Sequence, residues 1–127
     1  MAAQLNHTIV HSNDPQAAAQ FVADILGLPP PKPFGHFTVV QTGNAVSLDF
    51  MHSEQPISAQ HYAFLVSEAE FDAAFERIKQ RGLQYWADPA ARRPGEINHH
   101  DGGRGLYWEG PDGHWLEIIT RPYGAGG

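Results

Sequence analysis

The sequence predicts an α+β domain built from two similar halves. The order strand, helix and further strands occurs twice along the 127 residues, and apolar positions recur with the periods of amphipathic strands and helices. A strand histidine opens each half, and when His7 is aligned with His61, Phe21 in the first helix falls on Phe75 in the second. Because the order of elements is kept, we expect a single domain, 1–127, with an internal duplication.

The first half begins with a strand at 5–12, in which alternate residues share a face. A helix at 13–27 follows, because an Asn-Asp-Pro start and a terminal glycine are typical of helix ends and an apolar stripe runs between them. The proline-rich stretch 29–33 ends this helix. Two strands, 36–43 and 45–52, are then expected to pair around a Gly-Asn turn.

A polar connection at 53–59 is the expected boundary between the halves. The second helix opens with a capping box, in which Ser67 and Glu70 each accept a hydrogen bond from the other's backbone. The expected elements of the second half are a strand at 60–67, a helix at 67–82, a short strand at 83–87, a polar loop at 88–103 and a closing hairpin of strands at 104–110 and 114–120.

Composition and charge narrow the class of protein. Eight basic against fourteen acidic residues give a net charge of −6, which argues against nucleic-acid binding. There is no cysteine, so disulfides, thiolate metal sites and cysteine nucleophiles are excluded. No apolar run approaches the roughly 18 residues of a membrane helix, and no secretory signal is visible. We expect a cytoplasmic protein that does not bind membranes.

One carboxylate lies where the strand pattern predicts an apolar environment. On the strand 114–120, Glu117 shares a face with Trp115 and Ile119, and neither face of this strand has the polar character of a solvent face. Burial of an ionised carboxylate is costly unless a cation or a base compensates it. Considered alone, Glu117 could also be an outward-facing strand carboxylate.

Two histidines also lie on strand faces where the pattern predicts apolar neighbours. His7 lies between Leu5 and Ile9 on one strand face, and His61 occupies the repeat-related position. In a pseudo-symmetric fold equivalent strands lie side by side, so both imidazoles would converge with Glu117. A set of two histidines and one carboxylate leaves coordination positions open on a divalent metal, which can then take two substrate oxygens and stabilise negative charge on them. The alternative for each histidine is a hydrogen-bonded structural role.

Four further residues are candidates for catalysis or substrate binding. Asp49 ends the first half as Glu117 ends the second, and we expect it to act as a base or ligand, or else to lie outside the site. His100 lies in the polar loop, and loops above a cavity often close on ligands. Arg104 and Tyr107 could orient an oxygen-rich substrate, with cross-strand packing as the alternative. Tyr123 is interpreted as a tail anchor.

The chain resembles the vicinal oxygen chelate superfamily, which includes glyoxalase I, extradiol dioxygenases, fosfomycin-resistance enzymes and bleomycin-resistance proteins. The motifs that carry the resemblance are "LNHTIV" (5–10), "QHYAFLV" (60–66) and "YWEGPDGHWLEI" (107–118). The resemblance implies two βαβββ modules that form a cupped mixed sheet with helices on its outer face. The first module would cover about 4–55 and the second about 58–122.

By position, the resemblance implies His7, His61 and Glu117 as ligands of one divalent metal ion, with Fe, Mn, Zn, Ni and Co all open. Asp49 matches the fourth ligand of glyoxalase I, but its side chain is one carbon shorter than glutamate. We therefore expect a metal-dependent lyase, isomerase or dioxygenase that chelates a small oxygen-rich substrate and stabilises an oxyanion, and we expect a homodimer. The alternatives are a metal-free protein of the bleomycin-resistance type, which binds or sequesters a small molecule, and a structural interaction module.

Overall fold

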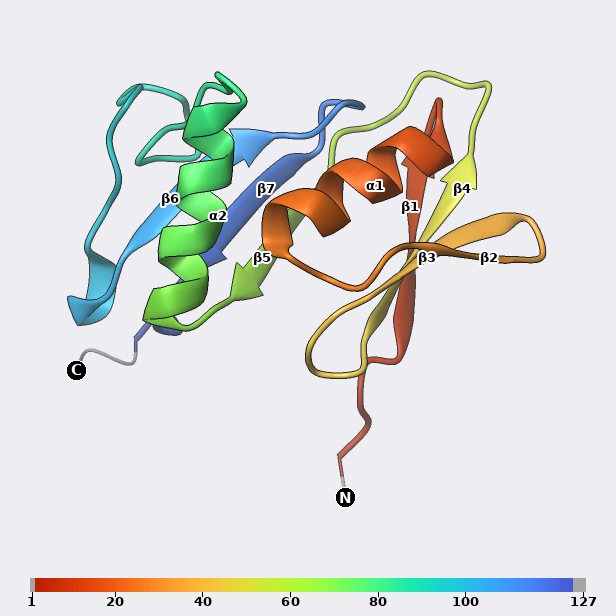
Figure 1. Ribbon diagram of the computed structural model, residues 1–127, viewed down its shortest axis with the longest axis horizontal. Coiled ribbons are helices and arrows are strands. Elements are labelled where there is room, and N and C mark those ends of the chain that lie inside the picture. Colours follow the sequence, from red (N-terminus) through yellow and green to blue (C-terminus); the bar gives the residue numbers. More distant parts are fainter. Residues whose placement is uncertain (1, 125–127) are drawn as a thin grey trace. The chain divides into compact units, whose positions relative to one another are not determined.

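The structure is a computed structural model that describes residues 2–124. It divides into two compact units between Ser58 and Ala59, inside the connection predicted at 53–59. Each unit contains one helix and one small mixed sheet (Figure 1), so the predicted α+β class and the repeated order of elements are confirmed. A cup formed jointly by the two sheets stays a prediction, as does the single domain. No helix in the described part of the chain is long and apolar enough to cross a membrane.

The first unit has the predicted βαβββ order. Its elements are β1 (His7–Ser12), α1 (Pro15–Leu26), β2 (Lys32–Phe34), β3 (Phe37–Gln41) and β4 (Ser47–His52). The sheet order is β1-β4-β3-β2, in which β1 and β4 are parallel and the other pairs are antiparallel. Because β1 and β4 are neighbours, residues far apart in the sequence lie side by side on this sheet (Figure 1).

Local signals fix α1, and its apolar face determines which side of the sheet is buried. Asp14 caps the helix by accepting a hydrogen bond from the backbone of Ala17 at 3.2 Å, and Gly27 ends it in the left-handed conformation that favours glycine. The buried core between helix and sheet comprises Val10, Ala18, Ala19, Val22, Ile25, Val40, Leu48 and Phe50. His7 and Asp49 lie on the opposite sheet face, which α1 does not cover.

The βαβββ order implied by the resemblance requires a third strand after the helix, but the residue pattern did not locate this strand, β2. It lies across the proline-rich stretch 29–33, which the sequence identifies only as a helix terminator. Three residues are too few to show alternation, and Pro33 is tolerated because β2 is the edge of the sheet and needs no further backbone donor there.

The second unit repeats the arrangement with a three-stranded sheet. Its elements are β5 (His61–Leu65), α2 (Glu68–Gln80), the 3-10 turn η1 (His100–Gly102), β6 (Gly105–Glu109) and β7 (Trp115–Ile119). The sheet order is β5-β7-β6, with β5 and β7 parallel and β6 and β7 antiparallel. The strand predicted at 83–87 is reduced to bridges at Trp86, which exchanges two 2.9 Å backbone hydrogen bonds with Tyr107.

The capping box of Ser67 and Glu70 is present at the start of α2, as predicted.

The side chains on both faces of β7 are covered by other residues, but one face is apolar and the other carries a carboxylate. The buried core beneath α2 contains Phe71, Ala74, Ile78, Leu106, Trp108, Leu116 and Ile118. The other face of the sheet carries Glu117 between Tyr107 of β6 and Ala63 of β5, which are its paired neighbours.

Candidate functional site

The second unit brings two predicted ligands, His61 and Glu117, into direct contact. Glu117 pairs with Ala63 in the parallel ladder of β5 and β7, so His61 lies on the same sheet face two residues earlier. The Nε2 atom of His61 is 2.8 Å from Oε1 of Glu117. The carboxylate side chain is only 2% exposed, whereas the imidazole is 46% exposed. The pair therefore joins a buried acid to a partly exposed imidazole.

The second oxygen of Glu117 also has a partner. The Tyr123 hydroxyl, from the segment that follows β7, donates a hydrogen bond to Oε2. The hydroxyl groups of Tyr107 and Tyr123 are 3.1 Å apart. Because an ionised carboxylate only accepts, Tyr123 gives its single proton to Glu117, and Tyr107 must then donate to Tyr123. The three side chains form a directed chain of hydrogen bonds that offsets the burial of the charge.

Both tyrosines of this chain resist ionisation. Burial raises the pKa of Tyr107, and the negative charge of Glu117 adds to this effect. Partial burial likewise raises the pKa of Tyr123, and its hydrogen bond to Glu117 adds to it. The two hydroxyl groups therefore remain protonated donors across the neutral range.

A pocket of about 420 Å³ opens beside these tyrosines. Its lining residues are His100, Asp101, Tyr107 and Tyr123. The structure thus brings together His100 and Tyr107, which the sequence predicted as substrate-binding residues. Asp101 also accepts a hydrogen bond from the backbone of Gly124 at 3.0 Å, which ties the C-terminal segment to this wall.

Arg104, the third predicted substrate-binding residue, is already engaged by α2. Its guanidinium contacts Glu68 and Asp72, each at 2.8 Å. It also lies 4.3 Å from the centre of the Phe71 ring. Burial acts to lower the pKa of Arg104, but the hydrogen bonds and charges of Asp72 and Glu68 together outweigh it, so that the pKa is raised. Arg104 thus anchors the start of β6 to α2, and its role in substrate binding stays a prediction.

The first unit holds the remaining predicted ligand on its open sheet face. His7 Nδ1 lies 2.7 Å from the Asn6 carboxamide oxygen. Since that oxygen accepts the proton of Nδ1, Nε2 carries the free lone pair that a metal ion requires. Asp49 is on the neighbouring strand β4, and its Oδ1 accepts a 3.0 Å hydrogen bond from Ser47.

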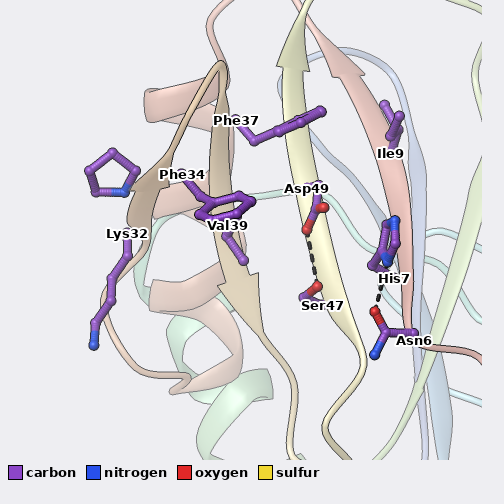
Figure 2. Close-up of a pocket in the computed structure, with 10 residues that line it drawn as sticks. Asn6, His7, Ile9, Lys32, Phe34, Phe37, Val39, Ser47 and Asp49 are labelled. Carbon is purple, nitrogen blue, oxygen red and sulfur yellow. Dashed lines mark hydrogen bonds between the residues drawn. The ribbon is translucent and has the colours of Figure 1, made fainter.

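His7 and Asp49 face one pocket of about 580 Å³ (Figure 2). Figure 2 shows the two side chains on adjacent strands, with Asp49 bonded to Ser47 and His7 bonded to Asn6. The other lining residues are Ile9, Lys32, Pro33, Phe34, Phe37 and Val39. This pocket therefore combines a polar end with an apolar, partly aromatic wall.

The predicted metal centre takes its ligands from both units, so it stays a prediction. Within either unit alone, the described residues contain no group of three histidine, aspartate or glutamate side chains that could hold a metal ion. The donor set nevertheless fits a divalent cation. His61 and the buried Glu117 place an imidazole nitrogen and a carboxylate oxygen close enough to bind the same ion. Both groups are ordinary ligands of transition metals.

The chain belongs to the glyoxalase/bleomycin resistance protein/dioxygenase superfamily, whose family model matches residues 4–118. It is similar to the solved structure of oxidase ChaP-H1, at 66% identity, with a TM-score of 0.95 and coverage of 97% of this chain and 99% of the other. Oxidase ChaP-H2 is 61% identical, with a TM-score of 0.96 and full coverage of both chains. Glutathione transferase FosA of Serratia marcescens is 27% identical over 124 residues, which cover 93% of this chain and 81% of that protein.

The resemblance predicted from the three motifs is therefore confirmed at the level of the family. The relatives include two proteins named as oxidases and one named as a transferase, so the family alone does not fix a reaction. Tyr123 is the site residue that sequence reasoning interpreted only as a tail anchor. A tyrosine in a glycine-rich tail carries no periodicity, and its contact with Glu117 arises from the turn of the chain after β7.

Proposed function

We propose that this protein is a metal-dependent oxidase that acts on a small, oxygen-rich substrate. The observation that carries the proposal is the contact between His61 and the buried Glu117, because a carboxylate with this environment is suited to bind a cation. The reaction class is supported by the high identity to oxidases ChaP-H1 and ChaP-H2 over nearly the whole chain.

His61, Glu117 and His7 would hold the divalent ion. Fe, Mn, Zn, Ni and Co all accept this donor set, and two histidines with one carboxylate are typical of iron sites in oxygen chemistry. When bound, the ion would polarise two substrate oxygens and stabilise the negative charge that develops on them. The open coordination positions left by three protein ligands are what allow a substrate to reach it.

The polar side chains beside Glu117 would bind and orient the substrate. His100 and Tyr107 line the same pocket. The His100 imidazole can donate to substrate oxygens, whereas the Tyr107 hydroxyl, whose proton goes to Tyr123, can accept from a substrate hydroxyl, and both contacts favour oxygen-rich molecules. Asp49 would act as a base in the other pocket. Because Ser47 already occupies Oδ1, the proton from a substrate hydroxyl would be taken at Oδ2.

A second candidate function is metal-free binding of a small molecule. The apolar wall of the pocket around His7, formed in part by Phe34 and Phe37, favours this alternative because such a wall would retain a ligand without any chemistry. In either case we propose a cytoplasmic homodimer, by analogy with the superfamily and in keeping with the acidic, cysteine-free composition.

Metal analysis of the purified protein tests the main proposal. We expect about one equivalent of a transition metal per chain, and loss of this metal in His61→Ala and in Glu117→Gln. Oxygen uptake should then appear with a panel of phenols, catechols and quinols once the metal is restored. Protein that binds no metal from any of the five ions, yet retains a small molecule tightly, would instead establish the binding function.

A further inference from the structure

The segment that follows β7 contributes a residue to the candidate metal centre. We propose that Tyr123 is a positioning residue that fixes the orientation of the Glu117 carboxylate, so that Oε2 is held by the protein and Oε1 alone is presented to the ion. This inference rests on the proposed function, because it assigns a role within the same centre.

The geometry distinguishes Tyr123 from a residue that merely covers the core. The residue is 54% exposed, so burial of apolar surface does not explain where its side chain lies. Its hydroxyl nevertheless reaches a carboxylate that is almost completely buried. An exposed tyrosine with an inward hydroxyl is expected when the hydrogen bond, rather than packing, holds the side chain in place.

The hydroxyl is itself oriented by a second residue. Tyr107 stands directly opposite Glu117 in the antiparallel pair of β6 and β7, on the same sheet face. Its hydroxyl, 3.1 Å from that of Tyr123, fills the acceptor side of the Tyr123 oxygen. The proton of Tyr123 therefore has one direction left, toward Oε2 of Glu117.

The backbone next to Tyr123 is also held in place, by contacts with η1. Gly124 donates to Asp101 at 3.0 Å, and the rings of His100 and Tyr123 meet edge-to-face with their centres 6.2 Å apart. Two independent contacts thus hold Tyr123 against η1. A ligand that is hydrogen-bonded by a fixed partner keeps one orientation, and loss of such partners typically weakens metal binding 10–100-fold.

Titration of metal-free protein with Co²⁺ tests the proposal without any enzyme assay. We expect Tyr123→Phe, which removes only the hydroxyl, to bind Co²⁺ about tenfold more weakly than the unmodified protein. The visible absorption of bound Co²⁺ should also change, because a released carboxylate can offer both oxygens and alter the coordination number. Tyr85→Phe is the matched control, since the Tyr85 ring packs on Phe75 at 5.0 Å and should leave affinity and spectrum unchanged.

The outcomes distinguish a failure of the Tyr123 inference from a failure of the proposed metal centre itself. If the unmodified protein takes up no Co²⁺, or if His61→Ala binds it equally well, the metal centre itself is wrong and the inference falls with it. If those results hold but Tyr123→Phe matches Tyr85→Phe in affinity and spectrum, only the role of Tyr123 is wrong. Should Tyr123→Phe fail to fold, Tyr107→Phe removes the donor to Tyr123, and unchanged Co²⁺ binding there would overturn the inference.

Discussion

Asp49 and Glu117 occupy equivalent positions in their own sheets. Each lies on the strand parallel to the first strand of its unit, paired with the residue two positions after a histidine: Ile9 for Asp49 and Ala63 for Glu117. The duplication therefore extends from the order of elements to the register of single residues. The two carboxylates differ in their partners, since Ser47 binds Asp49 whereas an imidazole and a phenol bind Glu117.

From this difference in partners we expect separate roles for the two carboxylates. Asp49→Asn keeps the size of the side chain but removes the proposed base, so we expect the metal content to be unchanged and kcat to fall by roughly 10²- to 10⁴-fold. The measurement is oxygen uptake together with metal analysis of the same sample. Ser47→Ala, which removes only the hydrogen bond to Oδ1, should have a much smaller effect. Loss of metal in Asp49→Asn would instead identify Asp49 as a fourth ligand.

The elements that the sequence predicted are those whose signals are local. The cap of α1 at Asp14 and the capping box of α2 lie within one turn of the helices they start. The closing hairpin of β6 and β7 was predicted because both strands are apolar and flank a Pro-Asp-Gly turn. The expectation that His61 and Glu117 converge with His7 was not local in this sense, because it came from the internal repeat together with a charged side chain among apolar strand neighbours. The structure places His61 2.8 Å from Glu117, and the shared metal centre stays a prediction.

The features that the sequence did not predict depend on contacts made across the fold. The strand expected at 83–87 has a suitable composition, but within it only Trp86 forms β-bridges, because the chain then turns away into a long loop. Tyr123 acquires its role from the path of the tail. Arg104 was predicted to face a substrate, and nothing in the sequence indicates that Glu68 and Asp72 would lie beside it.

A variant at Arg104 separates the anchoring role from the predicted substrate-binding role. Arg104→Ala removes a cation–π contact and two ion pairs with exposed partners, which together should lower the free energy of unfolding by about 1–2 kcal/mol. Denaturant unfolding measures this loss. If the arginine only anchors α2, KM for any substrate found in the oxygen-uptake screen should be unchanged. A rise in KM with unchanged stability would assign it to substrate binding instead.

The capping box of α2 makes stability depend on pH in the acid range. The hydrogen bond from the Ser67 backbone lowers the pKa of Glu70 from its usual value of 4.5, so the folded state binds this proton less readily than the unfolded chain. The contribution of its charge is therefore present above pH 4.5 and is lost as the pH falls through the lowered pKa. Glu70→Gln keeps an accepting oxygen but has no charge.

We accordingly expect Glu70→Gln to be less stable than the unmodified protein at neutral pH and equally stable at a pH well below the folded pKa of Glu70. Urea unfolding at the two pH values measures the difference in free energy. An equal loss at both pH values would mean that the charge plays no part and that the amide simply fits the cap less well.

Gly105 at the start of β6 is required by a buried asparagine. A Cβ atom built there would lie 2.8 Å from Oδ1 and 3.1 Å from Nδ2 of Asn98. Asn98 cannot move aside freely, because it is 5% exposed and its Nδ2 donates a 2.8 Å hydrogen bond to the Ala87 carbonyl. Gly105→Ala should therefore lower the free energy of unfolding by about 1–3 kcal/mol, as overpacking typically does.

The matched control is Gly43→Ala, where a Cβ atom would meet nothing within 4 Å. We expect this second variant to be within about 0.5 kcal/mol of the unmodified protein, as is usual for an open surface position. Thermal or urea unfolding of both variants gives the comparison. Because Asn98 also exchanges backbone hydrogen bonds with Gly105, its displacement would loosen the loop that leads to His100. Equal stability of the two variants would show that Asn98 can yield and that the glycine is not required for packing.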